Sequence, residues 1–107
     1  MKLYNLNDFI KGWIIGNFYP SLLNTNDVEV AIKRYIKDDY DESHYHKIAT
    51  EYTIIVDGEV RMNDKFYKKD DVIIIEPGDI TDFEVLSDNC TTVVIKIPGV
   101  NNDKYIK

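Results

Sequence analysis

Short runs of apolar and β-branched residues, separated by tight turns, make up most of the chain. Over residues 28–36, apolar side chains recur at every second position between charged ones, which is typical of a half-buried strand. Similar runs predict further strands over 52–56, 72–75, 83–86 and 91–97. Helical periodicity is almost absent. The pattern therefore predicts an all-β fold, built as an antiparallel sandwich or barrel.

Turn residues predict where these strands end. Asp57-Gly58 lies between two apolar runs and predicts a two-residue β-hairpin. A second tight turn is predicted over 62–65. Residues 72–75 form an uninterrupted apolar run, which predicts a strand buried on both faces. The acidic stretch 38–43 predicts a polar, solvent-exposed loop.

The chain divides into a core and two flanking segments. Its 107 residues are the length of a single domain, with a core over about 28–97, an N-terminal arm over 1–27 and a C-terminal tail over 98–107. Asn7 is placed to cap a short helical turn in the arm. Trp13 follows it and either packs as a core anchor or lines a ligand pocket.

Composition excludes several classes of partner. Hydrophobic residues make up 44% and charged residues 30% of the chain, as in a folded protein. The net charge of −6 and the lack of a basic stripe argue against binding to the phosphate backbone of nucleic acids. Polar residues interrupt the apolar runs near the N-terminus, so we expect neither a membrane partner nor a leader segment. The single cysteine, Cys90, cannot form an internal disulfide, and we expect a cytoplasmic protein.

Both histidines of the chain lie within three positions, as His44 and His46, and Glu51 follows five residues later. Side chains at positions i and i+2 of an extended segment point to the same face, so both imidazoles would project together. The glutamate enters the next predicted strand and would complete a pocket. In the predicted strand over 28–36, Arg34 lies an even number of residues from the apolar positions, so it shares their face. We expect it to point inward, where it needs an anionic partner from the protein or from a ligand.

The spacing of these residues resembles the first sequence motif of the cupins. His44 and His46, followed by Glu51 and Gly58, match the pattern HxHx4Ex6G. The resemblance implies a double-stranded β-helix, or jelly-roll barrel, usually dimeric, with a pocket inside the barrel mouth. It also implies that His44, His46 and Glu51 ligate a divalent metal, as the matching residues do in metal-binding cupins.

The second cupin motif is only partly present. Gly78 and Phe83 resemble it, but Thr81 stands where metal-binding cupins have a further histidine, and Glu76 stands where proline is common. We expect Thr81, Glu76 and Phe83, together with Arg34, to contact the ligand. A further oxygen ligand for a metal would come from Glu76, Asp79 or Asp82.

Two alternatives for the chemistry remain open. In the first, His44, His46 and Glu51 hold Fe, Mn, Ni or Zn, with open positions for the substrate. In the second, which the resemblance to cupin-type isomerases and epimerases implies, the site works without metal. A histidine then acts as the base, and a tyrosine or the second histidine acts as the acid. The candidate tyrosines are Tyr35, Tyr45 and Tyr52, and we assign Tyr52 to the catalytic set with the two histidines and Glu51.

The sequence thus predicts a small cupin that acts on a small polar metabolite, with a carbohydrate derivative favoured, as an isomerase or epimerase. The alternative is a protein that binds a sugar, a nucleotide-like ligand or a metal complex without converting it. A purely structural dimerisation domain would leave the paired histidines unexplained. We also expect a homodimer, with the apolar patch from Trp13 to Phe18 as its contact.

Overall fold

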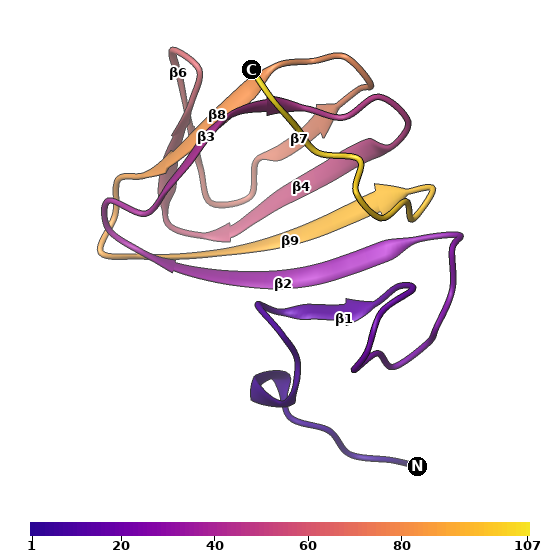
Figure 1. Ribbon diagram of the computed structural model, residues 1–107. Helices are drawn as coiled ribbons and strands as arrows, with labels where there is room; N and C mark the ends of the chain where they lie inside the picture. The colour runs from indigo at the N-terminus through magenta and orange to yellow at the C-terminus, as the bar shows by residue number, and fades with distance from the viewer.

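The computed structural model describes residues 1–107 and consists almost entirely of β-strands. Two five-stranded sheets face each other (Figure 1). Sheet A has the order β1 (Trp13–Ile15), β2 (Glu29–Ile36), β9 (Asn89–Ile97), β4 (Thr50–Asp57) and β7 (Val72–Ile75). Sheet B has the order β10 (Tyr105–Ile106), β3 (Tyr40–Tyr45), β8 (Thr81–Val85), β5 (Glu59–Met62) and β6 (Lys65–Lys68). Every pairing is antiparallel, which confirms the predicted all-β architecture.

Side chains from both sheets meet in a buried core. Its main cluster draws on β4, β5, β7, β8 and β9 and consists of Ile55, Val60, Met62, Ile75, Val85 and Cys90. Burial, with a smaller effect of the Asp57 carboxylate, raises the pKa of the Cys90 thiol to about 11. The thiol is therefore protonated at neutral pH and acts as a small apolar core residue.

The chain passes from sheet A to sheet B at Gly58. Because β4 pairs with β7 and β9, and β5 with β6 and β8, the predicted hairpin at Asp57-Gly58 is wrong. Gly58 has a φ of +99°, and a Cβ there would lie 2.6 Å from the carbonyl oxygen of Asn89 and 2.9 Å from Cα of Cys90. Glycine is needed here for a close backbone approach where the chain changes sheets, not for a two-residue turn.

The alternation along β2 is offset by one residue from the predicted one. Ala31 is fully buried, and Lys33 and Tyr35 face the space between the sheets. Arg34 is exposed on the opposite face, so the prediction that it points inward is wrong. It failed because the apolar residues of β2 that define the pattern lie on the outer face of sheet A, which is itself apolar.

Cross-strand neighbours form two apolar rows on this outer face. One row runs over β2, β9, β4 and β7 through Ile32, Val93, Ile54 and Val72, and the next runs through Val30, Ile95, Tyr52 and Ile74. The last strand, β7, is at the edge of the sheet, and Val72 and Ile74 are 63% and 58% exposed. The prediction that residues 72–75 are buried on both faces is therefore wrong, since sequence alternation cannot show that one apolar face is left uncovered.

Two short segments differ from the predictions, and one turn agrees with them. Most of the acidic stretch 38–43 belongs to β3 instead of a loop, because it pairs with β8 and its alternate side chains face solvent. The helical turn is a 3₁₀ helix over Leu6–Asp8, capped by Asn5 instead of Asn7, in an arm that extends away from the sheets (Figure 1). The turn at 62–65 is confirmed by the pairing of β5 with β6. None of the helical structure is long and apolar enough to cross a membrane.

We expect Gly58→Ala to lower the free energy of unfolding by about 2–3 kcal/mol, because backbone strain at positive φ adds to the displacement of the Asn89 backbone. Gly78→Ala is the matched control. Gly78 has a φ of +90°, but nothing lies within 4 Å of a Cβ placed there, so this variant carries the strain alone. Urea unfolding followed by circular dichroism measures both losses. If both variants lose the same free energy of unfolding, the close approach of Asn89 is not the reason why position 58 needs glycine.

Candidate functional site

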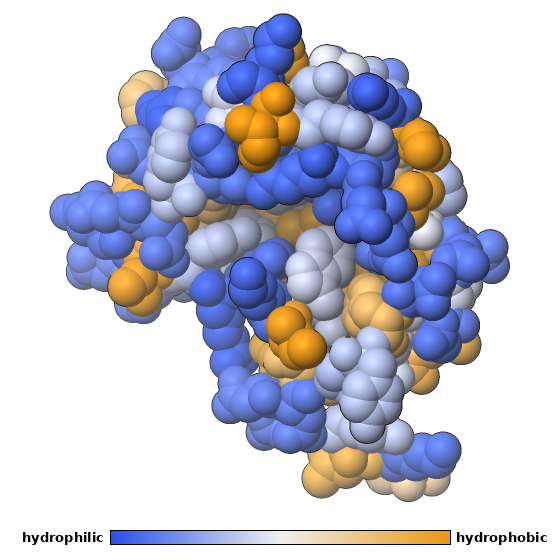
Figure 2. All heavy atoms as spheres, in the orientation of Figure 1, coloured by the Kyte–Doolittle hydropathy of each residue, from blue (hydrophilic) through white to orange (hydrophobic).

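A cavity of about 350 Å³ opens between the two sheets. Figure 2 shows recessed apolar atoms in the opening between the sheets, below a rim of hydrophilic residues. His44, His46 and Glu51 all line this cavity, although they come from β3, from the loop that follows it and from β4. Thr81 and Phe83 of β8 line it as well. The cavity therefore collects most of the side chains that the sequence motifs single out.

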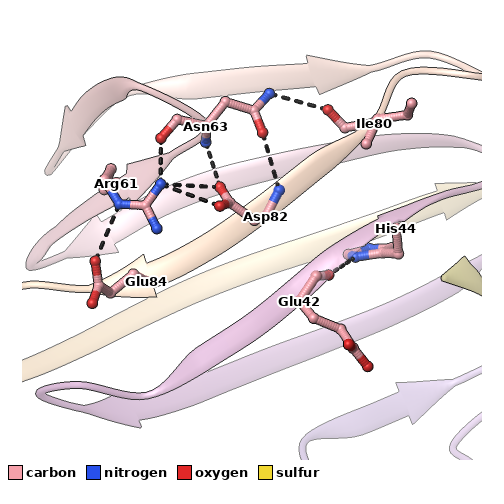
Figure 3. A network of polar contacts seen from close by, with 7 residues as sticks. All are labelled: Glu42, His44, Arg61, Asn63, Ile80, Asp82 and Glu84. Carbon is pink, nitrogen blue, oxygen red and sulfur yellow. Dashed lines mark hydrogen bonds and ion pairs between the residues drawn. The ribbon is translucent and has the colours of Figure 1, made fainter. Parts of the chain in front are cut away.

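The two imidazole rings lie side by side, with centroids 5.3 Å apart and planes 82° apart. Nδ1 of His44 lies 3.0 Å from the backbone oxygen of Glu42, a contact drawn in Figure 3. A carbonyl oxygen only accepts hydrogen bonds, so Nδ1 carries the proton and donates it. In the neutral ring, Nε2 of His44 is then left as an acceptor.

His46 is the more buried of the two, at 3% exposure. Its Nε2 atom is buried and has no hydrogen-bond partner in the protein. Burial lowers the pKa of His46 below its usual range, and the nearby ammonium group of Lys96 lowers it further, while the carboxylate of Glu51 opposes the shift. The ring is therefore neutral at neutral pH, and it leaves one buried nitrogen without a partner beside the cavity.

Glu51 is held in place by its neighbour on the same face of β4. The hydroxyl of Thr53 donates a 2.8 Å hydrogen bond to Oε2 of Glu51. In the register of sheet A, Glu51 lies directly opposite Lys96 of β9. One carboxylate oxygen is thus already engaged, and a lysine stands opposite Glu51 on the neighbouring strand.

Thr81 stands directly opposite His44 in the pairing of β3 with β8. The position where metal-binding cupins have a further histidine is therefore next to the histidine pair, but it offers a hydroxyl. Phe83, two residues on, packs against Tyr35 with ring centroids 5.0 Å apart. These two rings form an aromatic part of the cavity wall.

Three residues predicted to belong to the site do not line this cavity. Arg34 and Tyr52 lie at strand positions whose side chains point to the outer face of sheet A. Glu76 is exposed in the turn after β7, where its backbone N–H donates to Asp79 at 2.9 Å. Alternation explains the error for Tyr52: its neighbours Glu51 and Thr53 point inward, so it must point out. Tyr35 is the tyrosine that lines the cavity.

The three predicted metal ligands are not arranged as a metal centre. No group of three or more His, Cys, Asp or Glu side chains is arranged to hold a metal ion. Asp82, considered as an additional ligand, is turned away toward Arg61, whose Nη1 lies 3.2 Å from it (Figure 3). As they stand, the predicted ligands His44, His46 and Glu51 do not fit a three-ligand centre, and a metal there stays a prediction.

Sequence reasoning missed the charged residues of the cavity. Lys11, Lys33, Lys96 and Lys104 line it, together with Asp41 and with Trp13 of β1. Of the two roles left open for Trp13, the structure supports lining a pocket. The correct alternation along β2 would have identified Lys33. The other charged residues come from the N-terminal arm, from separate strands and from the tail, so no local pattern joins them.

The C-terminal tail fixes the loop that carries His46. Asp103 is 5% exposed, and its carboxylate accepts hydrogen bonds from the backbone N–H groups of Lys47, Ile48 and Ala49 at 3.0, 3.1 and 2.9 Å. Burial alone would raise the pKa of Asp103, but these three donors, together with His46, hold it below its usual value. Beside this contact, β10 pairs with the end of β3. The tail therefore positions both histidines.

We expect Asp103→Asn to lower the free energy of unfolding at neutral pH by about 2 kcal/mol, because an amide NH₂ would face backbone donors that a carboxylate accepts. The pKa of Asp103 is lower in the folded state than its ordinary value of 3.8. The variant should therefore lose the full amount of unfolding free energy above pH 3.8, and the loss should fade as the pH drops through the lower folded-state pKa. Asp27→Asn, at an exposed aspartate, is the control. Urea unfolding from pH 3 to pH 7 tests this, and a loss that does not depend on pH would contradict it.

No protein-family model matches the chain, and no curated protein matches it in sequence. Solved structures do match it. A conserved protein of Klebsiella pneumoniae with a double-stranded β-helix domain superposes with a TM-score of 0.77 at 16% identity, over 98% of this chain and 90% of that one. The similarity spans nearly the whole of both chains.

Two enzymes share the architecture at similarly low identity. The DMSP lyase DddQ from Ruegeria pomeroyi has a TM-score of 0.71 at 13% identity, over 94% of this chain and 54% of that one. Oxalate decarboxylase from Bacillus subtilis, a protein with Mn(II) centres, has a TM-score of 0.65 at 14% identity, over 77% of this chain and 24% of that one. Identities this low show the fold alone. The chain has the double-stranded β-helix fold of the cupins, as its first motif implies.

Proposed function

We propose that the protein is an acid–base isomerase or epimerase for a small polar carbonyl compound, with carbohydrate derivatives as the class to test first. The observation that carries the proposal is Nε2 of His46, which is buried at the cavity and has no partner in the protein. A buried polar atom left unpaired costs about 1–3 kcal/mol, so a group of the ligand is the expected partner.

In the proposed reaction, Nε2 of His46 removes a proton from the carbon next to the carbonyl group. The C–H electron pair forms the C=C bond of an enolate, and the carbonyl oxygen takes the negative charge. Return of a proton to the same carbon from the other side, from a His44 ring that is protonated at Nε2, gives the epimer, and proton exchange with solvent then returns both histidines to their starting forms. Return of the proton from His46 to the former carbonyl carbon, while the hydroxyl proton of the first carbon moves to the enolate oxygen, gives the isomer. Each reaction balances in protons, and no co-reactant is consumed.

Tyr35 is the proposed hydrogen-bond donor to the enolate oxygen. Burial, and then the carboxylates of Asp41 and Glu51, raise the pKa of its hydroxyl, so that it stays protonated. Tyr45 is less suitable because it stacks on Tyr105, with ring centroids 5.4 Å apart, and does not line the cavity. Glu51, in this scheme, opposes the lowering of the pKa of His46 and favours the imidazolium once the proton has been taken.

A metal-dependent reaction is the second candidate. It is supported by Nε2 of His44, an acceptor in the neutral ring, and by the unpartnered Nε2 of His46, because neutral imidazole is a good ligand for Fe, Mn, Ni and Zn. The similar fold of a protein with Mn(II) centres also supports it. Bound there, a metal would supply Lewis acidity to the substrate oxygen. The absence of a converged third ligand makes the metal-free reaction the first choice.

We also propose that the protein is a homodimer that joins through the outer face of sheet A. The two apolar rows over β2, β9, β4 and β7 support this contact, because large exposed apolar faces mark interaction sites. A second copy is the proposed partner. Two chains with a net charge of −6 repel each other, so this largely uncharged face is where a second copy can approach. The strand positions on this face carry two charged residues, Arg34 and Asp57, both of which pair with Thr91 of β9 beyond the two apolar rows. The contact therefore differs from the sequence-based expectation of a patch from Trp13 to Phe18.

We expect the protein to catalyse exchange of deuterium from solvent into a ketose or ketose phosphate, followed by NMR over a panel of such compounds. His46→Gln should slow the exchange by about 100-fold or more, since it removes the base. Because burial lowers the pKa of His46, the wild-type rate should stay constant down to the ordinary histidine value of about 6.5 and fall only below it.

Tyr35→Phe should also slow the exchange, whereas Tyr40→Phe, at an exposed tyrosine of β3, should not. A wild-type rate in His46→Gln would rule out His46 as the base. Exchange that appears only after Fe, Mn, Ni or Zn is added would favour the second candidate. Binding of a panel member without any exchange would identify a binding protein that does not convert its ligand.

For the dimer, we expect the wild-type protein to sediment at about twice the mass of one chain and Ile74→Asp to sediment as a monomer, because a carboxylate would be buried in the apolar contact. Asp64→Asn, in the turn between β5 and β6, is the control and should stay dimeric. Analytical ultracentrifugation over a range of concentrations measures the mass. A monomeric wild type, or a dimeric Ile74→Asp, would contradict the proposed contact.

A further inference from the structure

The cavity is lined mainly by positive charge, although the protein as a whole is acidic. Four lysines face two carboxylates in its wall: Lys11, Lys33, Lys96 and Lys104 against Asp41 and Glu51. The complete chain, in contrast, carries a net charge of −6. Lys104 forms an ion pair with Asp41 at 2.9 Å. The remaining lysines of the wall have no such partner, because the other ion pairs of the protein involve His44 and Arg61.

Two of these lysines lie close to the single tryptophan. Nζ of Lys33, from β2, and Nζ of Lys96, from β9, each lie 5.1 Å from the centroid of a Trp13 ring. Neither ammonium group donates a hydrogen bond to a side chain or to the backbone. A tryptophan face attracts cations, but only weakly at exposed sites, by about 0.5–1 kcal/mol. The Trp13 ring therefore attracts the ammonium groups of Lys33 and Lys96 but does not neutralise their charges.

The nearby carboxylates do not neutralise Lys33 and Lys96. Glu29 and Glu51 are the cross-strand neighbours of Lys96, yet no carboxylate oxygen lies within 4.0 Å of its ammonium group. Glu51 is engaged by Thr53, and burial raises the pKa of Glu29, which disfavours its charged form. Burial, and then the charges of Lys96 and Lys11, lower the pKa of Lys33, and the carboxylate of Asp41 opposes this shift without reversing it, as expected where cations outnumber anions.

We propose that Lys33 and Lys96, both beside Trp13, together with the exposed Lys11, bind an oxyanion group of the ligand, either a carboxylate or a phosphate. Lysine binds such groups as a compact point charge with several donors. The inference rests on the proposed function and names its substrate class: the carbonyl compound is a sugar acid or a sugar phosphate. Its charged end lies against the lysines, and its reacting carbon lies at His46.

Because Trp13 is the single tryptophan, its fluorescence reports binding at this place directly. Phosphate and malonate are the probes, titrated at constant ionic strength against sodium chloride. We expect a saturable change in fluorescence with at least one probe and none with chloride. A saturable response to phosphate alone identifies a phosphate subsite, and one to malonate alone identifies a carboxylate subsite.

Lys33→Met and Lys96→Met, which keep most of the apolar stem of each side chain, should each weaken probe binding by about 10-fold or more. Lys37→Met is the matched control, because Lys37 is exposed just beyond β2 and does not line the cavity. The wild-type titration stands even if a variant fails to fold. No saturable response to either probe would overturn the inference, and so would unchanged affinity in both folded cavity variants.

The two proposals can fail separately. Fluorescence titration needs no turnover, so an anion site without deuterium exchange would leave this inference intact and overturn the isomerase. Exchange into neutral ketoses without any response to phosphate or malonate would keep the isomerase and overturn the anion site.

Discussion

The buried carboxylate of Asp103 is the contact on which the geometry of the site depends. It accepts three backbone hydrogen bonds from the residues that directly follow His46 and so closes the loop between β3 and β4. Each donor lies more than 50 positions away in sequence, at separations of 56, 55 and 54 residues. The C-terminal tail thus holds the loop that carries His46 and pairs with the strand that carries His44.

The two faces of sheet A have different roles. Residues of odd number on β2 and even number on β9 point inward and supply Lys33, Tyr35, Thr92 and Lys96 to the cavity. Their neighbours point outward and form the apolar rows that we propose as a dimer contact. A single strand therefore contributes to both surfaces, and a shift of one residue in its alternation exchanges them. Substitutions on the outer face are expected to change assembly with little effect on the cavity.

Much of the fold followed from the sequence, and less of the site did. Strong β patterns were enough for the all-β architecture. The motif from His44 to Gly58 and the partial second motif around Gly78 were enough to bring the histidine pair, Glu51 and Thr81 to one cavity. Arg34 and Tyr52 were misplaced because alternation gives two faces without saying which one is covered. Asp103 and the lysines could not be found from local pattern, because pairing between distant strands brings them together. The role of Gly58 was misread, since a glycine that permits a turn and one that permits close approach look alike in sequence.

The central claim is that His46 is a neutral base with an unpartnered nitrogen in a positively charged cavity. With two histidines in the chain, an NMR titration of their ring signals, assigned with His44→Gln, tests it most directly. The account predicts that His46 titrates below the ordinary histidine value of about 6.5 and that its signals shift when ligand fills the cavity. A His46 that titrates at or above that value, or that does not respond to any ligand bound in the cavity, would contradict it.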